Sequence, residues 1–259
     1  MLYICLPSHN ESATVGVLLW RIRKVFQEYS REYEVLVYDD ASTDATRETL
    51  EPYAKVMPLT VLGGKSRVGY AGAVDALVRA ASDRTRYPRR DAVVLMQADF
   101  TDQPEHLPEL VKRFEGGADL VIGERVIDAS APESARKRAA LLRRLCTLWP
   151  FRSFVAVPGV ADPFGSYRLV RLSVVREVLK TRGAGVLPDL PVSAVNAELN
   201  REIAAEARRV ESVPLSTRWD LRPRDTRVEP WRDALDVTKR AWATRGKHGQ
   251  RAAARTKTA

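Results

Sequence analysis

Short apolar runs alternate with helix-patterned segments along the first half of the chain. The runs predicted as strands are Leu2–Leu6, Glu34–Tyr38, Pro58–Leu62, Ala92–Met96 and Leu120–Ile122. Segments with apolar residues at helical spacing lie between them, at Ala13–Tyr29, Asp44–Tyr53, Ala71–Ser82 and Glu105–Phe114. Strands that are apolar on both faces, with helices between them, are typical of a mainly parallel sheet in a layered α/β domain.

The second half is less regular. It contains a basic helical stretch at Ser134–Thr147 and a loop through Pro158 and Gly159. A segment from Asp162 to Arg168 then leads into a helix from Ser173. The last segments are helix-like Val192–Arg208, strand-like Val210–Leu215 and helix-like Pro230–Ala243. We therefore predict one domain over residues 1–225, a C-terminal helix over 226–245 and a basic, disordered tail over 246–259.

Polar residues follow three of the predicted strands. Asn10 and Glu11 come after the first, Asp39 and Asp40 after the second, and Asp99 after the fourth. Because ligands of parallel sheets bind at the carboxyl ends of the strands, we expect these groups to converge on one site. The carboxylates suit either a divalent metal or a ribose and base. The competing interpretation is that Asp40 and Asp44 form turns and cap the next helix.

The overall charge indicates an anionic partner. The formal net charge is +9 and the isoelectric point is near 9.8, which fits nucleic acid, an acidic lipid surface or a phosphorylated substrate. Nucleic acid is the weakest of the three, because acids interrupt the basic residues and no aromatic-basic motif is present. The two cysteines make a disulfide framework or a Cys-rich zinc site implausible, and a reducing cytoplasm fits best.

No stretch reads as a signal peptide or a membrane span. Contact with a membrane would therefore come from the surface, and we expect a cytoplasmic protein that could lie peripherally at the inner face of the membrane. Trp219, Trp231 and Trp242 with the basic tail could dock on anionic lipid. We favour the competing interpretation, in which Trp231 and Trp242, eleven residues apart, pack against the domain from one helical face.

A series of motifs resembles family 2 glycosyltransferases, above all the branch that contains dolichyl-phosphate mannose synthase. The matching motifs, in order, are Pro7-x-x-Asn10-Glu11, Val37-x-Asp39-Asp40-x-Ser42-x-Asp44, the segment Arg67 to Ala73, Gln97-Ala98-Asp99, Pro104-Glu105, Gly123-Glu124-Arg125 and Asp162 with Gly165-x-Tyr167-Arg168. The resemblance covers roughly residues 1 to 220. Each motif alone is weakly specific, and their shared order and spacing are highly specific.

The resemblance implies a GT-A fold, related to the Rossmann fold, a nucleoside-diphosphate sugar donor, a divalent cation and inversion at the anomeric carbon. Pro7, Asn10, Glu11 and Asp39 would hold the nucleoside, with Asp40 near the ribose. The remaining donor-site positions implied are Arg67, Gly69, Gln97 and Ala98, and Asp99 would hold Mg²⁺ or Mn²⁺. The competing interpretation of Gly69 is that it starts a helix packed close to the sheet.

Gln97 departs from the family, whose members usually have Asp at this position. A glutamine offers a carbonyl oxygen without a charge, so affinity for a hard cation should fall. Three interpretations follow: Asp99, the diphosphate and waters hold the metal; arginines assist a weak metal site; or the domain binds its donor without turnover. The position two after Asp99 is Thr101, where synthases of this branch often have Gln, and Asp102 or Gln103 could take the place of that Gln.

The acceptor side is predicted to be cationic. The resemblance implies that cations for a polyprenyl phosphate gather at six arginines, Arg125, Arg136, Arg138, Arg143, Arg144 and Arg168, and arginine gives bidentate phosphate contacts. Arg125 and Arg168 lie at motif positions. Arg143 and Arg144 are equally consistent with a solvated helix face. A hydroxyl acceptor would instead need a base, for which Asp162 or Glu198 is a candidate. The family's Arg-x-x-Gly-x-Ser-Lys loop is replaced by residues 218–224, which remain cationic.

Two hypotheses from different classes remain. The first is an inverting glycosyltransferase that moves a hexose from a UDP- or GDP-sugar to a lipid phosphate or hydroxyl. The second is a non-catalytic nucleotide-sugar-binding domain, motivated by Gln97. Turnover of a sugar donor distinguishes them. The sequence predicts no oligomeric state.

Overall fold

A computed structural model of the chain describes residues 1–127, 131–147, 156–183 and 191–216. Its strands are β1 (Leu2–Ser8), β2 (Tyr33–Asp39), β3 (Leu59–Leu62), β4 (Ala92–Leu95), β5 (Leu120–Val126), β6 (Arg168–Arg171) and β7 (Val210–Ser216). Its helices are α1 (Val15–Glu28), α2 (Thr46–Ala54), α3 (Gly69–Arg84), the 3₁₀ turn η1 (Pro104–His106), α4 (Leu107–Glu115), α5 (Glu133–Thr147), α7 (Leu172–Arg182) and α8 (Val192–Glu206).

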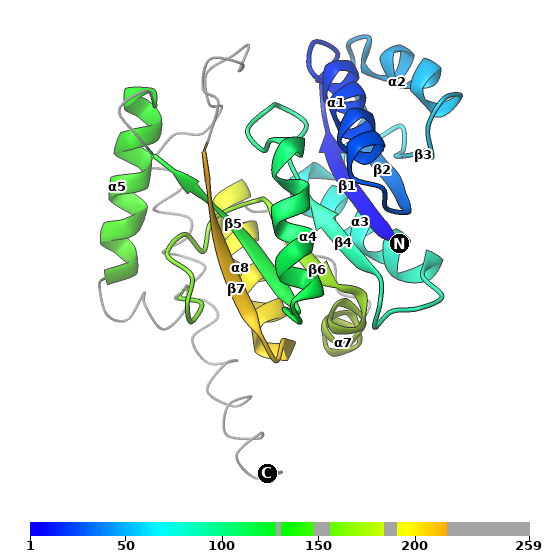
Figure 1. Cartoon of the computed structure of the whole chain (residues 1–259). Coiled ribbons are helices and arrows are strands. Elements are labelled where there is room, and N and C mark those ends of the chain that lie inside the picture. The colour runs from blue at the N-terminus through cyan, green and yellow to red at the C-terminus, as the bar shows by residue number, and fades with distance from the viewer. Residues whose placement is uncertain (128–130, 148–155, 184–190, 217–259) are drawn as a thin grey trace.

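The strands form one sheet in the order β3-β2-β1-β4-β6-β5-β7 (Figure 1). All pairings are parallel except those of β6, which runs antiparallel to both β4 and β5. The chain leaves β1 for β2 on one side and returns to β4 on the other, so the strand order reverses between β1 and β4. This reversal point is where ligands bind in open α/β sheets.

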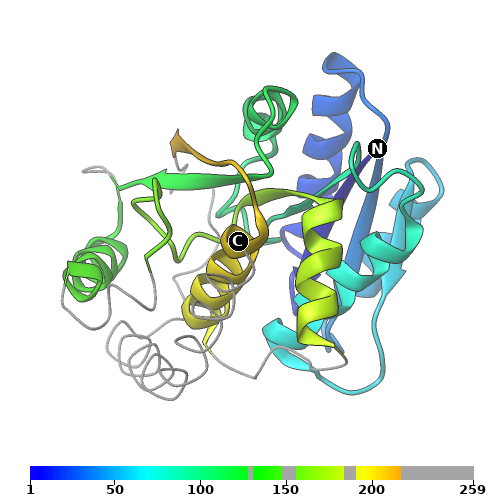
Figure 2. The same ribbon diagram turned by 90° about the horizontal axis from the view of Figure 1, so that it is seen from below.

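Helices cover both faces of the sheet, as Figure 2 shows. Along β1, Leu2, Ile4 and Leu6 point into the core beneath α1 and α4, whereas Tyr3 and Cys5 point into the core beneath α3, α7 and α8. Side chains alternate between the two faces of a strand, so a strand with helices on both sides must be apolar at every position. This burial explains the uninterrupted apolar runs in the sequence.

The prediction of a mainly parallel sheet is confirmed, with one strand missed. The segment after Asp162 was expected to lead directly into a helix, whereas β6 precedes α7. β6 has four residues and an arginine at each end, so it lacks an apolar run. Predicted boundaries are otherwise within a few residues; for example, β1 continues to Ser8 and β5 to Val126. The predicted C-terminal helix, basic tail and tryptophan surface lie outside the described residues.

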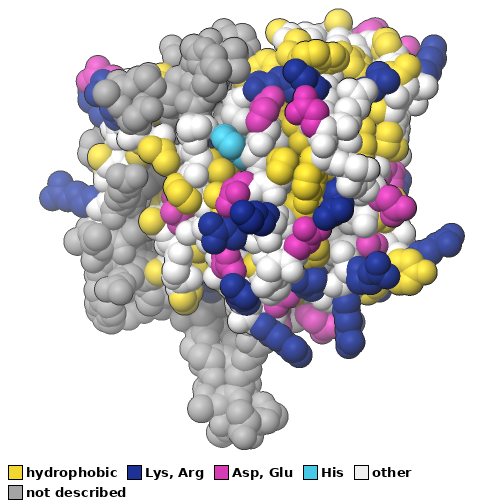
Figure 3. Space-filling view, viewed as in Figure 1, with side chains coloured by type: hydrophobic (Ala, Val, Ile, Leu, Met, Phe, Trp, Pro, Cys, Tyr) yellow, Lys and Arg dark blue, Asp and Glu magenta, His cyan; other side chains and the backbone are white. Residues whose placement is uncertain are grey.

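The described surface shows no single-sign charge field on the side covered by α1 and α4. Lysine and arginine side chains there are interspersed with aspartate and glutamate (Figure 3). Among the residues that the structure describes, no helix is long and apolar enough to cross a bilayer.

Candidate active site

The predicted donor-site residues lie at the carboxyl edge of the sheet, uppermost in Figure 1. Ser8 of β1 is in register with Asp39 of β2, and Cys5 is in register with Leu95 of β4. The loops after β2 and β4 therefore lie on either side of the end of β1, about 10 Å apart at two strand spacings. The sheet thus brings Asp39 and Asp99 to one edge, as the sequence predicted.

Asp39 ends β2 and is buried. One of its carboxylate oxygens accepts the backbone N–H of Ser42 at 3.1 Å, and the other pairs with the Nε of Arg47 at 3.3 Å. The next residue but one, Ala41, has a φ of 51°, in the left-handed region that alanine rarely adopts. The turn after β2 is therefore tight and held by Asp39 itself.

Asp40 holds the start of α3. Its two oxygens accept the backbone N–H groups of Val68 at 2.6 Å and Gly69 at 3.1 Å, and the Nε of Arg67 lies 3.6 Å away. Gly69 has a φ of 74°, which favours glycine. The N-terminal amides of a helix attract negative charge, so the Asp40 carboxylate acts as a cap supplied by a different element. The capping interpretation thus accounts for Asp40, although the helix is α3 and not α2.

The loop after β1 is joined to the loop after β2. Asn10 donates its backbone N–H to the Ser42 hydroxyl at 3.0 Å and accepts the backbone N–H of Thr43 on its side-chain oxygen at 2.8 Å. Glu11 donates its backbone N–H to the Thr46 hydroxyl at 2.9 Å. Asn10 also has a left-handed φ of 55°. Pro7, which precedes this loop, is half-buried in β1 beside β2.

Asp44 caps α2, as the sequence predicted. Its carboxylate accepts the backbone N–H of Thr46 at 3.0 Å and that of Ser12 at 3.1 Å. Burial acts to raise the pKa of Asp44, but the hydrogen bonds from Thr46 and Ser12 outweigh it and lower the pKa to about 2. Asp44 therefore stays ionised at neutral pH and joins the first two loops.

Asp99 lies in the loop after β4. It is half-buried and accepts the backbone N–H of Thr101 on one oxygen at 3.0 Å. Ala98 is buried beneath it, and Phe100 has a left-handed φ of 60°. The loops after β1, β2 and β4 thus each contain a non-glycine residue with positive φ. Strained backbone of this kind clusters at functional sites, which supports this edge as the site.

Gln97 is held on both its backbone and its side chain. Its backbone N–H donates to a carboxylate oxygen of Asp102 at 2.8 Å, and its side-chain Nε2 donates to the Tyr70 hydroxyl at 3.1 Å. Asp102 is buried, which raises its pKa, while the nearby charge of Arg125 acts to lower it. Asp102 therefore holds the loop after β4 from inside the domain.

Arg125 connects β5 to this loop. Its Nη2 donates to the Ser166 hydroxyl at 2.5 Å and lies 3.6 Å from an Asp102 oxygen, and Ser166 donates in turn to Asp102 at 3.0 Å. The Nε of Arg125 is buried and has no partner among the described residues. Arg125 therefore lies beside the loop after β4, with one hydrogen-bond donor unsatisfied among the described residues.

Arg168 differs from its predicted role. Its side chain is fully buried at the start of β6, and its guanidinium donates to the backbone oxygens of Gly165, Ser166 and Asn196 and to the side-chain oxygen of Asn196. A guanidinium surrounded by protein acceptors has no face for an acceptor phosphate. In this structure Arg168 holds α8 against the segment before β6.

The other predicted acceptor residues are spread out. Asp162 is half-buried and accepts the backbone N–H of Phe164 at 3.1 Å, so it shapes a turn. Arg136 and Arg144 are exposed on α5, which stands apart from the loops after β1, β2 and β4 in Figure 1. The side chains of Arg138 and Arg143 lie outside the described set, as do residues 217–225.

The residues present fit a metal that is shared with a diphosphate. Asp99 and Gln97 offer a carboxylate and a carboxamide oxygen, which are hard ligands suited to Mg²⁺ or Mn²⁺. Among the described residues, no group of three His, Cys, Asp or Glu side chains could hold a metal by itself. Mg²⁺ is commonly bound by one or two carboxylates together with substrate phosphates, which matches this donor set.

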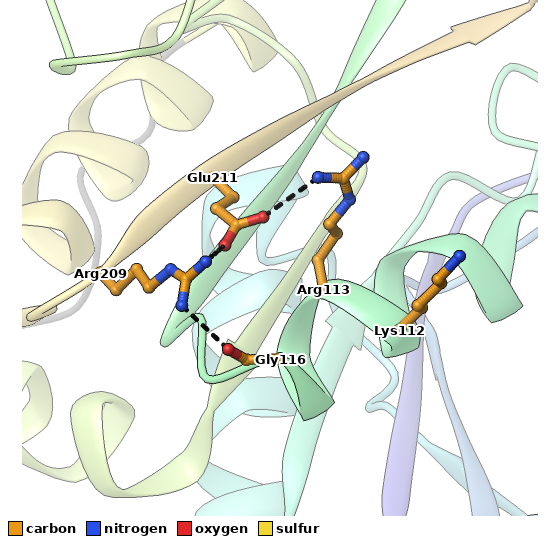
Figure 4. A pocket seen from close by; sticks show the side chains of 5 residues that line it. All are labelled: Lys112, Arg113, Gly116, Arg209 and Glu211. Carbon is orange, nitrogen blue, oxygen red and sulfur yellow. Dashed lines mark hydrogen bonds and ion pairs between the residues drawn. The ribbon is translucent and has the colours of Figure 1, made fainter.

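A cavity of about 350 Å³ lies at the opposite edge of the sheet. It is lined by Lys112, Arg113, Gly116, Arg209 and Glu211, at the end of α4 and the start of β7 (Figure 4). Glu211 pairs with Arg209 at 2.7 Å and with Arg113 at 3.5 Å. The charged groups that line the cavity are therefore largely paired, and the cavity is remote from the strand-end loops.

Sequence reasoning missed several residues that support the site. Tyr70, Ser166 and Asn196 all hydrogen-bond to groups beside Gln97 or Arg168. Tyr70 lies within a motif segment, which is a signal that could have found it. Asn196 lies in an otherwise ordinary helix, and nothing in its local sequence marks it.

Two similar proteins carry names that describe glycosyl transfer to polyprenyl phosphates. The chain is 28% identical over 238 residues to the undecaprenyl-phosphate mannosyltransferase of Micrococcus luteus, covering 85% of this chain and 93% of that protein. It is 26% identical over 175 residues to the dolichol-phosphate mannosyltransferase of Pyrococcus furiosus, covering 68% of this chain. The match spans about half, 47%, of the Pyrococcus protein.

Solved structures show the same fold. Glucosyl-3-phosphoglycerate synthase from Mycobacterium tuberculosis, in complex with Mn²⁺, UDP and glucosyl-3-phosphoglycerate, superposes with a TM-score of 0.61 at 20% identity, covering 94% of this chain and 78% of that one. S. aureus TarS 1-349 in complex with UDP-GlcNAc gives a TM-score of 0.55 at 16% identity, covering 84% of this chain and 58% of that one. The chain therefore has the predicted GT-A fold.

The sequence motifs and the fold agree with a family-wide comparison. A family model described as "Glycosyl transferase family 2" matches residues 3–179, which is more than half of the chain. The chain therefore belongs to glycosyl transferase family 2.

Proposed function

We propose that the chain is an inverting glycosyltransferase that moves a hexose from a UDP- or GDP-sugar to a polyprenyl phosphate, with a hydroxyl acceptor as the other possibility. The observation that carries the proposal is the convergence of Asp39 and Asp99 on either side of β1, at the point where the strand order reverses. The names of the Micrococcus and Pyrococcus relatives support a polyprenyl-phosphate acceptor.

Each strand-end loop has a task in this proposal. The loops after β1 and β2, with Asn10, Glu11 and Asp39, bind the nucleoside, and the α3 start held by Asp40 provides backbone near the diphosphate. Asp99 and Gln97 face the diphosphate and a divalent cation, which when bound stabilises the negative charge on the leaving group. The Mn²⁺ in the Mycobacterium complex supports a cation requirement without deciding between Mg²⁺ and Mn²⁺.

The acceptor decides whether a base is needed. A phosphate is already ionised and attacks the anomeric carbon directly, so the protein need only orient it. Arg125 lies beside the loop after β4 with its side chain 21% exposed, which supports a role in orienting the acceptor. A hydroxyl acceptor would need a carboxylate base, for which Asp162 is the half-buried candidate. A polyprenyl phosphate acceptor also implies work at a membrane surface.

The proposal is tested by turnover and product analysis. The purified chain is incubated with UDP- and GDP-sugars, with Mn²⁺ or Mg²⁺, and with undecaprenyl phosphate or, as the matched control, undecaprenol. We expect release of nucleoside diphosphate that depends on the phosphate, and a product with inverted anomeric configuration by NMR. Transfer to undecaprenol would establish the hydroxyl acceptor. If the chain bound a donor but neither hydrolysed nor transferred it under any condition, the proposed enzymatic activity would be refuted and a nucleotide-sugar-binding domain would remain.

A further inference from the structure

A chain of hydrogen bonds leads from Gln97, in the loop after β4, to the interior of the second half of the domain. The Gln97 Nε2 donates to the Tyr70 hydroxyl at 3.1 Å, the Tyr70 hydroxyl donates to the side-chain oxygen of Asn196 at 2.9 Å, and Arg168 donates to the same oxygen. The four residues come from β6, α8, α3 and the loop after β4. Arg168 and Asn196 are fully buried or nearly so.

The direction of every bond in this chain follows from the chemistry of Arg168. A guanidinium can only donate hydrogen bonds, so the atom of Asn196 that faces it must be the oxygen. That oxygen then accepts the hydrogen of the Tyr70 hydroxyl. A tyrosine hydroxyl carries its hydrogen at neutral pH. With its hydrogen directed at Asn196, the Tyr70 oxygen is left to accept.

Gln97 must therefore present its nitrogen to Tyr70. Its carboxamide oxygen is on the opposite side of the group, and the residue is only partly buried. The backbone of Gln97 is held independently by the bond from its N–H to Asp102. The two anchors together fix which way the carboxamide faces.

We propose that Tyr70 is a positioning residue, which fixes the carboxamide of Gln97 with its oxygen toward the donor's diphosphate and cation. The inference rests on the proposed function, because it concerns how position 97 serves that site. A carboxylate at this position would present an oxygen in either orientation, whereas a carboxamide has one oxygen and must be oriented. Tyr70 thus fixes the orientation that a carboxylate at position 97 would not need.

The test uses the symmetry of a carboxylate. Tyr70→Phe removes the hydroxyl and keeps the ring, and it is made both in the natural chain and together with Gln97→Glu, which keeps the side-chain length. Mn²⁺ binding is measured by electron paramagnetic resonance titration in the presence of UDP and, in parallel, GDP. We expect Tyr70→Phe to weaken Mn²⁺ binding by about threefold to tenfold in the natural chain and by less than about twofold in the Gln97→Glu background, since one neutral hydrogen bond is lost.

Two outcomes overturn the inference. Equal weakening in both backgrounds would show that Tyr70 acts only through local packing, and no weakening in either would show that it does not orient Gln97. Tyr87→Phe, at an exposed tyrosine, controls for the loss of a hydroxyl elsewhere.

A second measurement needs no ligand. The side-chain NH₂ signals of Gln97 in a ¹⁵N NMR spectrum, assigned with Gln97→Glu, are expected to exchange slowly with water and to lose that protection in Tyr70→Phe. Unchanged signals would refute the positioning role even if neither nucleotide bound. Protected signals without any nucleotide binding would refute the proposed function and leave the orientation intact.

Discussion

Replacing Asp40 by alanine removes the carboxylate that holds the first turn of α3. The two hydrogen bonds from the Val68 and Gly69 amides are lost, at 2.6 and 3.1 Å. A hydrogen bond to a charged group contributes about 1.5–3 kcal/mol net. Val68 is 42% exposed, so water can reach these amides and we take the lower value for each. The free energy of unfolding should therefore fall by about 3 kcal/mol.

This loss predicts a clear change in thermal stability. For a chain of this size about 3 kcal/mol lowers the melting temperature by about 6–12 °C, measured by calorimetry or circular dichroism. Asp40→Asn keeps one acceptor oxygen and should lose about half as much. Asp83→Ala, at an exposed aspartate near the other end of α3, is the matched control and should change stability by less than about 0.5 kcal/mol.

If Asp40→Ala melted within about 2 °C of the natural chain, the carboxylate would not be the anchor of α3. If that fully stable variant also bound UDP or GDP more weakly, the result would support the contact between Asp40 and the ribose that the family resemblance implies. We expect instead that stability and nucleotide binding fall together, because Arg67 and Gly69 lose their anchor.

Three further predictions concern neighbouring residues. The lowered pKa of Asp44 contributes stability above about pH 4 that is lost as the pH falls toward 2. In Asp44→Asn the free energy of unfolding in urea should therefore fall by about 1–2 kcal/mol less than in the natural chain over this pH range. An unchanged pH profile would contradict the cap. Gly63→Ala should destabilise by about 3 kcal/mol or more, because a Cβ would lie 2.2 Å from the Asp39 carbonyl at a φ of +132°. Gly64→Ala, whose Cβ would meet nothing closer than 4.0 Å, should be near neutral in the same melts. Asp99→Ala should lower Mn²⁺-dependent donor turnover by about 100-fold or more, and activity that survived would remove it from the metal site.

The amino-acid sequence alone was enough to predict the layered α/β fold and the edge of the sheet where the candidate site residues meet. The apolar runs and the polar residues after them are local features, so β1, β2 and β4 and their loops could be located without a structure. The cap by Asp44 was also predictable, because its partner Thr46 is two residues away. The strand β6 was missed because it is short and contains arginines.

Tertiary structure decided the roles of individual polar side chains. Arg168 was predicted to meet a phosphate, and the packing of α8 buries it among protein oxygens instead. Tyr70 and Asn196 are 126 residues apart in the chain, so no local pattern could show that they meet, or that they orient Gln97. A charged or amide group takes its role from whichever acceptors and donors reach it after folding, and those partners come from distant elements. The sequence by itself therefore determined which edge of the sheet gathers the candidate site residues, and only the tertiary structure decided which partners each of them has.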